Sequence, residues 1–182
     1  MHGTGLASVD EETGMISVLM VAGGNPEMSA TAVKSLKDNS QYDYQLVFVD
    51  NGSDKAENLS GAITPHLGVK DIFVRNDVFR SFARANNQAF ALAEGDYILG
   101  LNNDIVADGD WQTPLVTEVL KYDLCGPTLR QLAIVHDIKA MMCYRENGVP
   151  YDAKVTDVGA YVEGWCFFLK RDTYQKLGGF DE

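Results

Sequence analysis

Short apolar segments alternate along the chain with segments of helical periodicity. Four apolar segments, each followed by glycine or polar residues, predict strands at 16–22, 45–49, 69–74 and 97–101. Because these segments are apolar at nearly every position, they indicate strands buried on both faces of a parallel sheet. The intervening segments predict helices that would cover those faces, so we expect an α/β, Rossmann-like fold with a mostly parallel central sheet flanked by helices.

Two helices are predicted between these strands. The first spans 28–36, and Ser29 is its expected N-cap. The second begins after Ser81 as N-cap and ends before Gly95. Its inward-facing positions are expected to be Phe82, Ala85, Ala89, Leu92 and Ala93.

The second half of the chain has a less regular pattern. It predicts a helix over 111–122, a strand over 124–128, an extended segment over 158–169 and a helical turn over 172–177. The stretch between the second and third of these is not assigned. In α/β enzymes the more irregular half commonly carries the variable substrate contacts.

The length and composition indicate one domain. The chain has 182 residues, of which 46% are hydrophobic, which is enough for one sizeable core and too little for two. We assign residues 15–182 to a single domain. Residues 1–14, rich in glycine and acids, are expected to form a mobile leader.

The charge balance restricts the partners. Lys and Arg number 15 against 26 Asp and Glu, which gives a formal net charge of -11. Such a surface repels nucleic acid and anionic lipid, so neither is expected as a partner. A nucleoside diphosphate would be repelled too, and its binding would need a bridging cation or a local group of basic residues.

The cysteines and the apolar segments indicate a cytoplasmic protein. The three cysteines, Cys125, Cys143 and Cys166, are odd in number and far apart, which is typical of buried thiols in a reducing compartment. No segment reaches the roughly 20 apolar residues that a membrane span requires. We therefore expect a cytoplasmic chain without a membrane span, and we leave open whether it forms a homo-oligomer.

Polar residues follow two of the predicted strands directly. Asp50 and Asn51 come after the second strand, and Asn102, Asn103 and Asp104 come after the fourth. In an open α/β sheet, ligands bind outside the carboxyl ends of the strands. Asp50 would therefore contact a ligand or build an Asx turn, and Asp104 would hold a cation or belong to an ordinary turn.

Basic and amide residues gather in an otherwise acidic chain between 75 and 87. Arg80 and Arg84 lie four residues apart near the start of a predicted helix, and Asn86 follows them. They are the candidates to bind an anionic ligand, although any one of these arginines could simply be a solvated surface residue.

The remaining candidates lie in the second half. His136 is a candidate metal ligand, with a surface or packing role as the alternative. Trp165 would stack on a sugar ring or pack in the core. Glu163, Asp181 and Glu182 are candidate general bases, or else solvated acids.

Taken together, these segments resemble the family 2 glycosyltransferases, inverting enzymes of GT-A fold that use nucleotide-diphosphate sugars. The rhamnosyltransferase-like branch of that family is the nearest in pattern. The matching segments, in order, are 16–22, 47–54, 76–89, 93–104, 164–171 and 178–182.

The resemblance implies a sugar transfer from a nucleotide-diphosphate sugar donor to a saccharide or other hydroxyl acceptor, assisted by Mn or Mg. It places Asp50 at the base or ribose, and Asp104 at the last acid of the family's metal-binding motif. It also places the backbone around Ala22 to Asn25 in the same pocket, and Asn86 with Arg84 beside it at the nucleotide sugar. The further candidates to bind substrate are Asn51, Asn102, Asn103 and Trp165.

The chain also departs from the family's pattern. Asn102 stands where the first acid of the metal motif is usual, and the acidic motif that usually supplies the base lies beyond the last residue, Glu182. Either the chain is therefore a truncated or minimal form, or Asp181, Glu182 or Glu163 serves as the base. The alternatives are a nucleotide-sugar-binding module without catalysis and a sugar-nucleotide nucleotidyltransferase.

Overall fold

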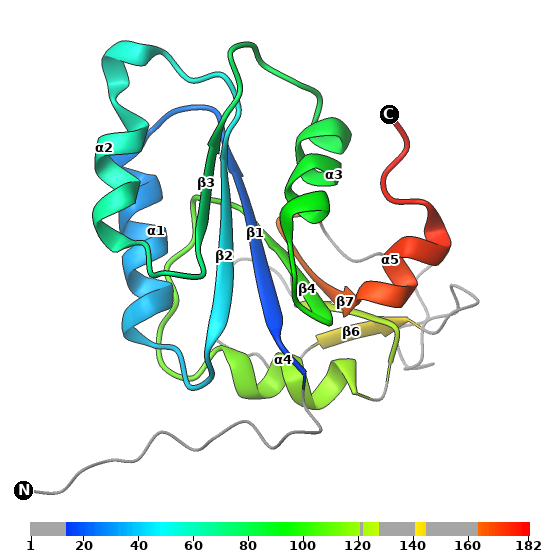
Figure 1. Cartoon of the computed structure of the whole chain (residues 1–182). Helices are drawn as coiled ribbons and strands as arrows, with labels where there is room; N and C mark the ends of the chain where they lie inside the picture. Colours follow the sequence, from blue (N-terminus) through cyan, green and yellow to red (C-terminus); the bar gives the residue numbers. More distant parts are fainter. Residues whose placement is uncertain (1–13, 121, 128–140, 145–163) are drawn as a thin grey trace, which may run out of the picture.

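A seven-stranded mixed sheet forms the centre of the molecule in the computed structural model, which describes residues 14–120, 122–127, 141–144 and 164–182 (Figure 1). The strands are β1 (Ile16–Ala22), β2 (Tyr44–Asp50), β3 (Ile72–Arg75), β4 (Tyr97–Leu101), β5 (Leu124–Pro127), β6 (Met141–Tyr144) and β7 (Cys166–Lys170). Their spatial order is β3-β2-β1-β4-β7-β5-β6.

The sheet has a parallel part and an antiparallel part. Strands β3, β2, β1 and β4 run parallel, and β7, β5 and β6 continue the sheet in antiparallel pairings. From β1 the chain builds outward to β2 and β3, and then returns to place β4 on the other side of β1. The order of the strands therefore reverses between β1 and β4, where α/β folds bind their ligands.

Helices cover both faces of the sheet (Figure 1). The helices are α1 (Pro26–Asp38), η1 (Lys55–Glu57), α2 (Leu59–Ile63), η2 (Thr64–His66), α3 (Phe82–Leu92), α4 (Gln112–Val119) and α5 (Arg171–Leu177). Helices α1, α2 and α4 pack with one face of the strands in one buried apolar cluster, and α3 and α5 pack in a second cluster on the other face. The α/β, Rossmann-like prediction is confirmed.

The predicted elements of the first half are largely confirmed. Strands β1 and β4 have the predicted bounds, and β2 is one residue longer at each end than predicted. Strand β3 begins three residues later and ends one residue later than predicted. Ser81 caps α3 as predicted, because its hydroxyl accepts a hydrogen bond from the backbone N–H of Arg84 at 3.3 Å. The three short helical segments between β2 and β3 were not predicted.

Two predictions about the helices are wrong. Ser29 is not an N-cap, because α1 begins earlier, at Pro26, whose fixed φ suits the first helical turn. Ser29 lies inside the helix, buried, and donates to the carbonyl of Gly24 at 3.4 Å. Phe82 does not face the core, because its side chain is 50% exposed at the start of α3.

The remaining expectations concern the leader, the domain assignment, a membrane span and the cysteines. Residues 1–13 lie outside the described residues, so the leader stays a prediction, as does the assignment of 15–182 to one domain. None of the helices in the described ranges is long and apolar enough to cross a membrane. Cys125 and Cys166 are buried, as expected.

Candidate functional site

A small pocket lies where the carboxyl ends of the parallel strands meet. Its volume is about 170 Å³, and its lining comes from the ends of β1, β2 and β4, from the start of α3 and from the residues before β7. The lining residues are Val21, Gly23, Asn51, Phe79, Phe82, Asn86, Leu101, Asn102 and Gly164. The pocket therefore occupies the point where the strand order reverses, between β1 and β4.

Asp50 is buried beside the pocket and is fully engaged by neighbouring groups. One carboxylate oxygen accepts a hydrogen bond from the backbone N–H of Ser53 at 2.9 Å, and the other is paired with the guanidinium of Arg75. Arg75 also donates to the Ser53 carbonyl at 2.5 Å. The Asx-type turn expected for this segment is thus present, and a contact of Asp50 with a ligand stays a prediction.

Asn51 fixes the loop that follows β3. Its side-chain oxygen accepts from the backbone N–H of Arg80 and from the side-chain amide of Asn76, both at 3.1 Å. Its side-chain nitrogen donates back to the Arg80 carbonyl at 2.9 Å. The end of β2 therefore holds the loop after β3 in one conformation, with Phe79 at the pocket.

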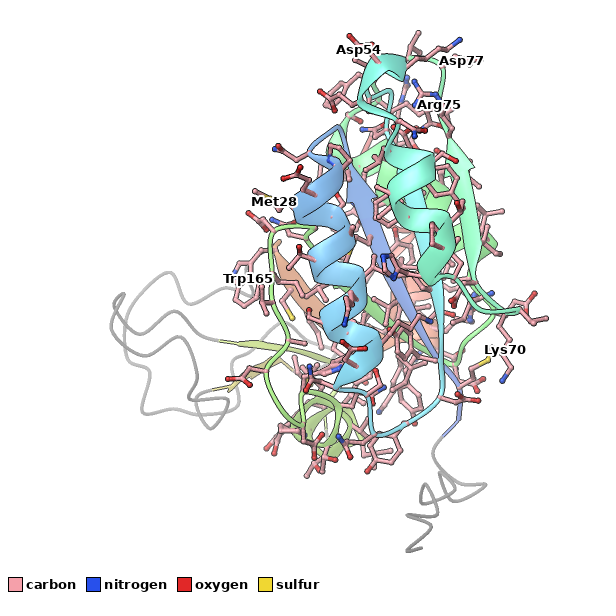
Figure 2. All side chains as sticks on the ribbon, turned by 90° about the vertical axis from the view of Figure 1, so that its left-hand side faces the viewer. Met28, Asp54, Lys70, Arg75, Asp77 and Trp165 are labelled. Atoms are coloured by element: carbon pink, nitrogen blue, oxygen red, sulfur yellow. The ribbon has the colours of Figure 1, made fainter. Side chains whose placement is uncertain are left out.

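Charged side chains surround this end of the sheet. Figure 2 shows Arg75 near Asp54 and Asp77, whereas Lys70 lies toward the opposite end of the molecule. Asp54 and Asp77 are both exposed. An anionic ligand approaching the pocket from this side would meet acids as well as arginine, which is consistent with a need for a cation.

The two candidate residues of helix α3 line two different hollows. Asn86 is buried, donates to the carbonyl of Phe82 at 2.9 Å and lines the pocket. Arg84 is exposed, and its Nε donates to a carboxylate oxygen of Glu182 at 3.2 Å. Arg84 therefore faces a second hollow rather than the pocket.

The three polar residues after β4 lie in three different surroundings. Asn102 lines the pocket, and its backbone N–H donates to the carbonyl of Trp165 at 2.8 Å. The side chain of Asn103 donates to the Ser29 hydroxyl at 2.8 Å, while Asp104 is exposed. Trp165 is partly buried and packs against the core cluster next to α1.

The loop after β1 completes this end of the sheet. The carbonyl of Ala22 accepts a hydrogen bond from the backbone N–H of Asn51 at 2.7 Å, which ties the ends of β1 and β2 together. Asn25 is exposed, with left-handed φ and ψ of 56° and 65°, directly before α1. Both residues thus border the same edge of the sheet as Asp50.

The donor set available for a metal is small. Among the residues with described positions, no group of three or more His, Cys, Asp and Glu side chains comes together as a metal site. Asp104 offers one exposed carboxylate two residues after Asn102, and carboxylate and amide oxygens are hard ligands that suit Mn or Mg. His136 lies outside the described residues, as does Glu163.

The candidate bases at the C-terminal end differ in their surroundings. Asp181 is exposed, whereas Glu182 accepts hydrogen bonds from Arg84 and, at 3.1 Å, from the side chain of Asn87. The same Asn87 accepts from the hydroxyl of Tyr174 at 2.5 Å. Burial, the largest cause, raises the pKa of Tyr174 to about 12.

Sequence reasoning missed the aromatic side of the pocket. Phe82 was expected in the core, and Phe79 was not singled out, yet both line the pocket and are 50% and 74% exposed. The sequence did contain a signal for their exposure. Both lie after the end of a strand and among arginine and asparagine residues, so their side chains have few apolar neighbours to pack against.

Comparisons with known proteins agree with this geometry. The sequence model described as "Glycosyl transferase family 2" matches residues 17–177. A relative named as a colanic acid biosynthesis glycosyl transferase, WcaA of Escherichia coli (strain K12), is 27% identical over 90 residues, which are 50% of this chain and 32% of that protein. The O-antigen biosynthesis protein RfbC of Myxococcus xanthus is 25% identical over 192 aligned residues, covering 93% of this chain and 15% of that protein.

A solved structure has the same fold. The mannosyltransferase PcManGT from Pyrobaculum calidifontis, in complex with GDP-Man and Mn2+, matches 92% of this chain and 48% of its own, with a TM-score of 0.63 and 16% identity. This likeness confirms the GT-A, Rossmann-like fold. The chain spans less than half the length of each of these three proteins.

Proposed function

The chain belongs to glycosyl transferase family 2, and from this premise we propose that it binds a nucleotide-diphosphate sugar and transfers the sugar to an acceptor hydroxyl. The observation that carries the proposal is the pocket at the reversal of strand order, lined from the ends of β1, β2 and β4 and by α3. A further point is its size. At about 170 Å³ it holds one ring of a donor, so the rest of the donor extends along the sheet edge.

The proposed donor contacts follow the strand ends. Ala22, Asn25, Asp50 and Asn51, at the ends of β1 and β2, border the nucleoside. The sugar and diphosphate side of the donor is bordered by Asn86, Asn102, Asn103 and Trp165, while Arg84 faces the neighbouring hollow. Of these, Asn86 and Asn102 line the pocket itself.

A divalent cation fits this arrangement. Asp104 is the described carboxylate that would hold Mn or Mg, with Asn102 beside it and His136 as a further candidate ligand. When bound, such a cation supplies positive charge to the departing diphosphate. In a chain with a formal net charge of -11, that charge also offsets the repulsion of the donor.

The proposed reaction is an inverting displacement. A carboxylate from Asp181, Glu182 or Glu163 takes the proton of the acceptor hydroxyl, and the oxygen attacks the anomeric carbon as the bond to the diphosphate breaks. Asp181 is exposed and could accept this proton. The expected product has the opposite anomeric configuration to the donor.

A second candidate function is donor binding without transfer. It is favoured by the engagement of Glu182, whose carboxylate already accepts hydrogen bonds from Arg84 and Asn87. A carboxylate that already accepts these two hydrogen bonds has fewer lone pairs open to an acceptor hydroxyl. Donor hydrolysis by the unchanged protein separates the two candidates, because a binding module gives none. Hydrolysis that is unaffected when Asp181, Glu182 and Glu163 are changed singly to Ala excludes all three as essential bases.

Calorimetry with nucleoside diphosphates tests the proposed function directly. UDP, GDP and dTDP are titrated into the protein with Mn²⁺ and with EDTA, and we expect at least one to bind about tenfold tighter with Mn²⁺. Asp104→Ala should lose this difference, whereas Asp108→Ala, which removes an exposed acid four residues further along, should keep it. Equal binding with and without metal contradicts the metal-assisted mode, and the absence of any binding contradicts the donor site.

A further inference from the structure

A second, larger hollow lies next to the pocket, on the outer side of α3. It has a volume of about 870 Å³ and is lined by Val78, Phe79, Arg80, Ser81, Arg84, Asn87, Gln88 and Glu182. These residues come from the loop after β3, the first turns of α3 and the C-terminal segment, which lie side by side (Figure 1). We call this hollow the outer groove.

Phe79 is the wall that the pocket and the outer groove share. Its side chain is 74% exposed, yet its backbone is fixed on both sides. A Cβ added to Gly52 would lie 2.5 Å from the nitrogen of Phe79, so the two loop backbones are in close contact, and Asn51 clamps the next residue, Arg80. The ring is therefore held in an exposed position by a defined loop.

The polar side chains of the groove are also fixed in place. Asn87 accepts from the backbone N–H of Phe180 and donates to the Phe180 carbonyl, both at 2.9 Å. Glu182 is held by Arg84 and Asn87, and Gln88 accepts from a guanidinium nitrogen of Arg80 at 3.3 Å. Each arginine has five N–H donors, so most of the donors at the groove stay available to a ligand.

We propose that the outer groove binds the acceptor as a saccharide, with Phe79 stacking on the apolar face of a sugar ring; this rests on the proposed function. A transfer reaction needs its two substrates in adjacent sites, and the shared wall makes the groove adjacent to the donor pocket. The volume of about 870 Å³ lies within the range of sites for small ligands.

The chemistry of the lining selects a saccharide. A sugar ring has an apolar face, which an aromatic ring covers, and hydroxyl groups around its edge, which need both donors and acceptors. Arg80 and Arg84 supply donors, Glu182 supplies acceptors, and the amide of Gln88 supplies both. The opposite charges of Arg84 and Glu182 leave only a small excess of positive charge, so a neutral or singly acidic sugar fits.

Saturation-transfer NMR with methyl glycosides tests this proposal. The probes are the methyl glycosides of glucose, galactose, mannose, rhamnose and glucuronic acid, each added at millimolar concentration to the protein with UDP, GDP or dTDP and Mn²⁺. At least one is expected to give a signal, and Phe79→Ala and Gln88→Ala should each weaken its binding by about fivefold or more. Val69→Ala, which removes a fully exposed apolar side chain before β3, at the end of that strand opposite the groove, should leave it unchanged.

The nucleoside diphosphate affinity, measured on the same samples, separates this proposal from the donor site. If the nucleotide binds to the wild-type protein and no methyl glycoside does, or if glycoside binding survives Phe79→Ala and Gln88→Ala, the acceptor groove is excluded and the donor site stands. If Gln88→Ala weakens the nucleotide instead, the groove belongs to the donor and the proposal is overturned. Thermal melting of each variant confirms that it is folded.

Discussion

Asp50 and Arg75 are paired in register on the neighbouring strands β2 and β3, and they form an ion pair whose carboxylate is completely buried. The guanidinium is 27% exposed and also donates to the hydroxyl and carbonyl of Ser53. The pair therefore joins the end of β3 to the turn after β2. It stabilises the edge of the sheet on which the proposed donor site is built.

We expect Arg75→Ala to lower the free energy of unfolding by about 3 kcal/mol, because it leaves the buried Asp50 carboxylate without its countercharge. Urea denaturation followed by circular dichroism measures this. The control is Lys34→Ala, which removes an ion pair with Asp38 whose side chains are 62% and 56% exposed, and which should cost less than about 0.5 kcal/mol. Equal losses in the two variants contradict the buried pair's role.

A second prediction concerns the contact between Gly100 in β4 and Phe167 in β7. These residues face each other in the antiparallel pairing, and a Cβ added at Gly100 would lie 1.9 Å from the Phe167 ring. The ring cannot withdraw easily, because it packs against Phe180 at 5.4 Å between ring centroids. We expect Gly100→Ala to destabilise the protein by about 3 kcal/mol.

Two further variants test this explanation for Gly100. Gly68→Ala should be tolerated within about 0.5 kcal/mol, because its added Cβ meets only the carboxylate of Asp71 at an ordinary 3.5 Å. Combining Gly100→Ala with Phe167→Leu should recover part of the lost stability, since the smaller side chain makes room. A double variant that is less stable than Gly100→Ala alone would show that the clash is not the cause.

These contacts also show how far the sequence alone reaches. The strands β1 and β4 were predicted with their bounds because each is a continuous apolar run ended by polar residues. The pairing of β4 with β7 was not predicted, because it joins residues far apart in the chain, such as Leu101 and Cys166. Local periodicity carries no information about such pairings.

Because local periodicity does not report contacts between distant residues, only part of the site could be predicted. The polar ends of β2 and β4 identified Asn51 and Asn102, since strand ends are visible in the pattern. Phe79 could not be placed, because its exposure depends on Gly52 and Asn51, which hold its loop from another part of the chain. Arg84 and Asn86 are two residues apart, yet only the helical phase of α3 decides that they face different hollows.

A third prediction concerns alkaline pH. Burial raises the pKa of the Cys166 thiol from 9.0 to about 12, and the pKa of Tyr174 is raised from 10.0 to about 12, by burial first and then by the charge of Glu182. In the unfolded chain both groups lose their protons at lower pH than in the folded chain. The contribution of these two groups to the free energy of unfolding should therefore be constant below about pH 8 and fall from about pH 9 to pH 12.

Urea titrations at a series of pH values measure this dependence. Cys166→Ala removes one of the two groups, so its stability should fall less steeply than that of the wild-type protein between about pH 9 and pH 12. Tyr174→Phe should reduce the slope in the same way, with an added loss at all pH values because the hydrogen bond to Asn87 is missing. Identical slopes in all three proteins contradict the assignment of the pH dependence to these groups.

The last prediction concerns the strength of the proposed metal site, which has a single acid among the three polar residues after β4. Asn102 lines the pocket, and Asp104 is exposed two residues later. Asn102→Asp would add a second carboxylate, and the affinity of hard cations rises with the number of charged oxygen ligands. We expect the Mn²⁺ concentration that gives half-maximal nucleoside diphosphate binding to fall about tenfold, measured by calorimetry at fixed nucleotide concentration.

Asn103→Asp is the matched control for this prediction. It adds the same charge at the neighbouring residue, whose side chain contacts Ser29, so it should change this Mn²⁺ concentration much less. If both variants lower it equally, the gain comes from the general charge of the loop and Asn102 is not beside the cation.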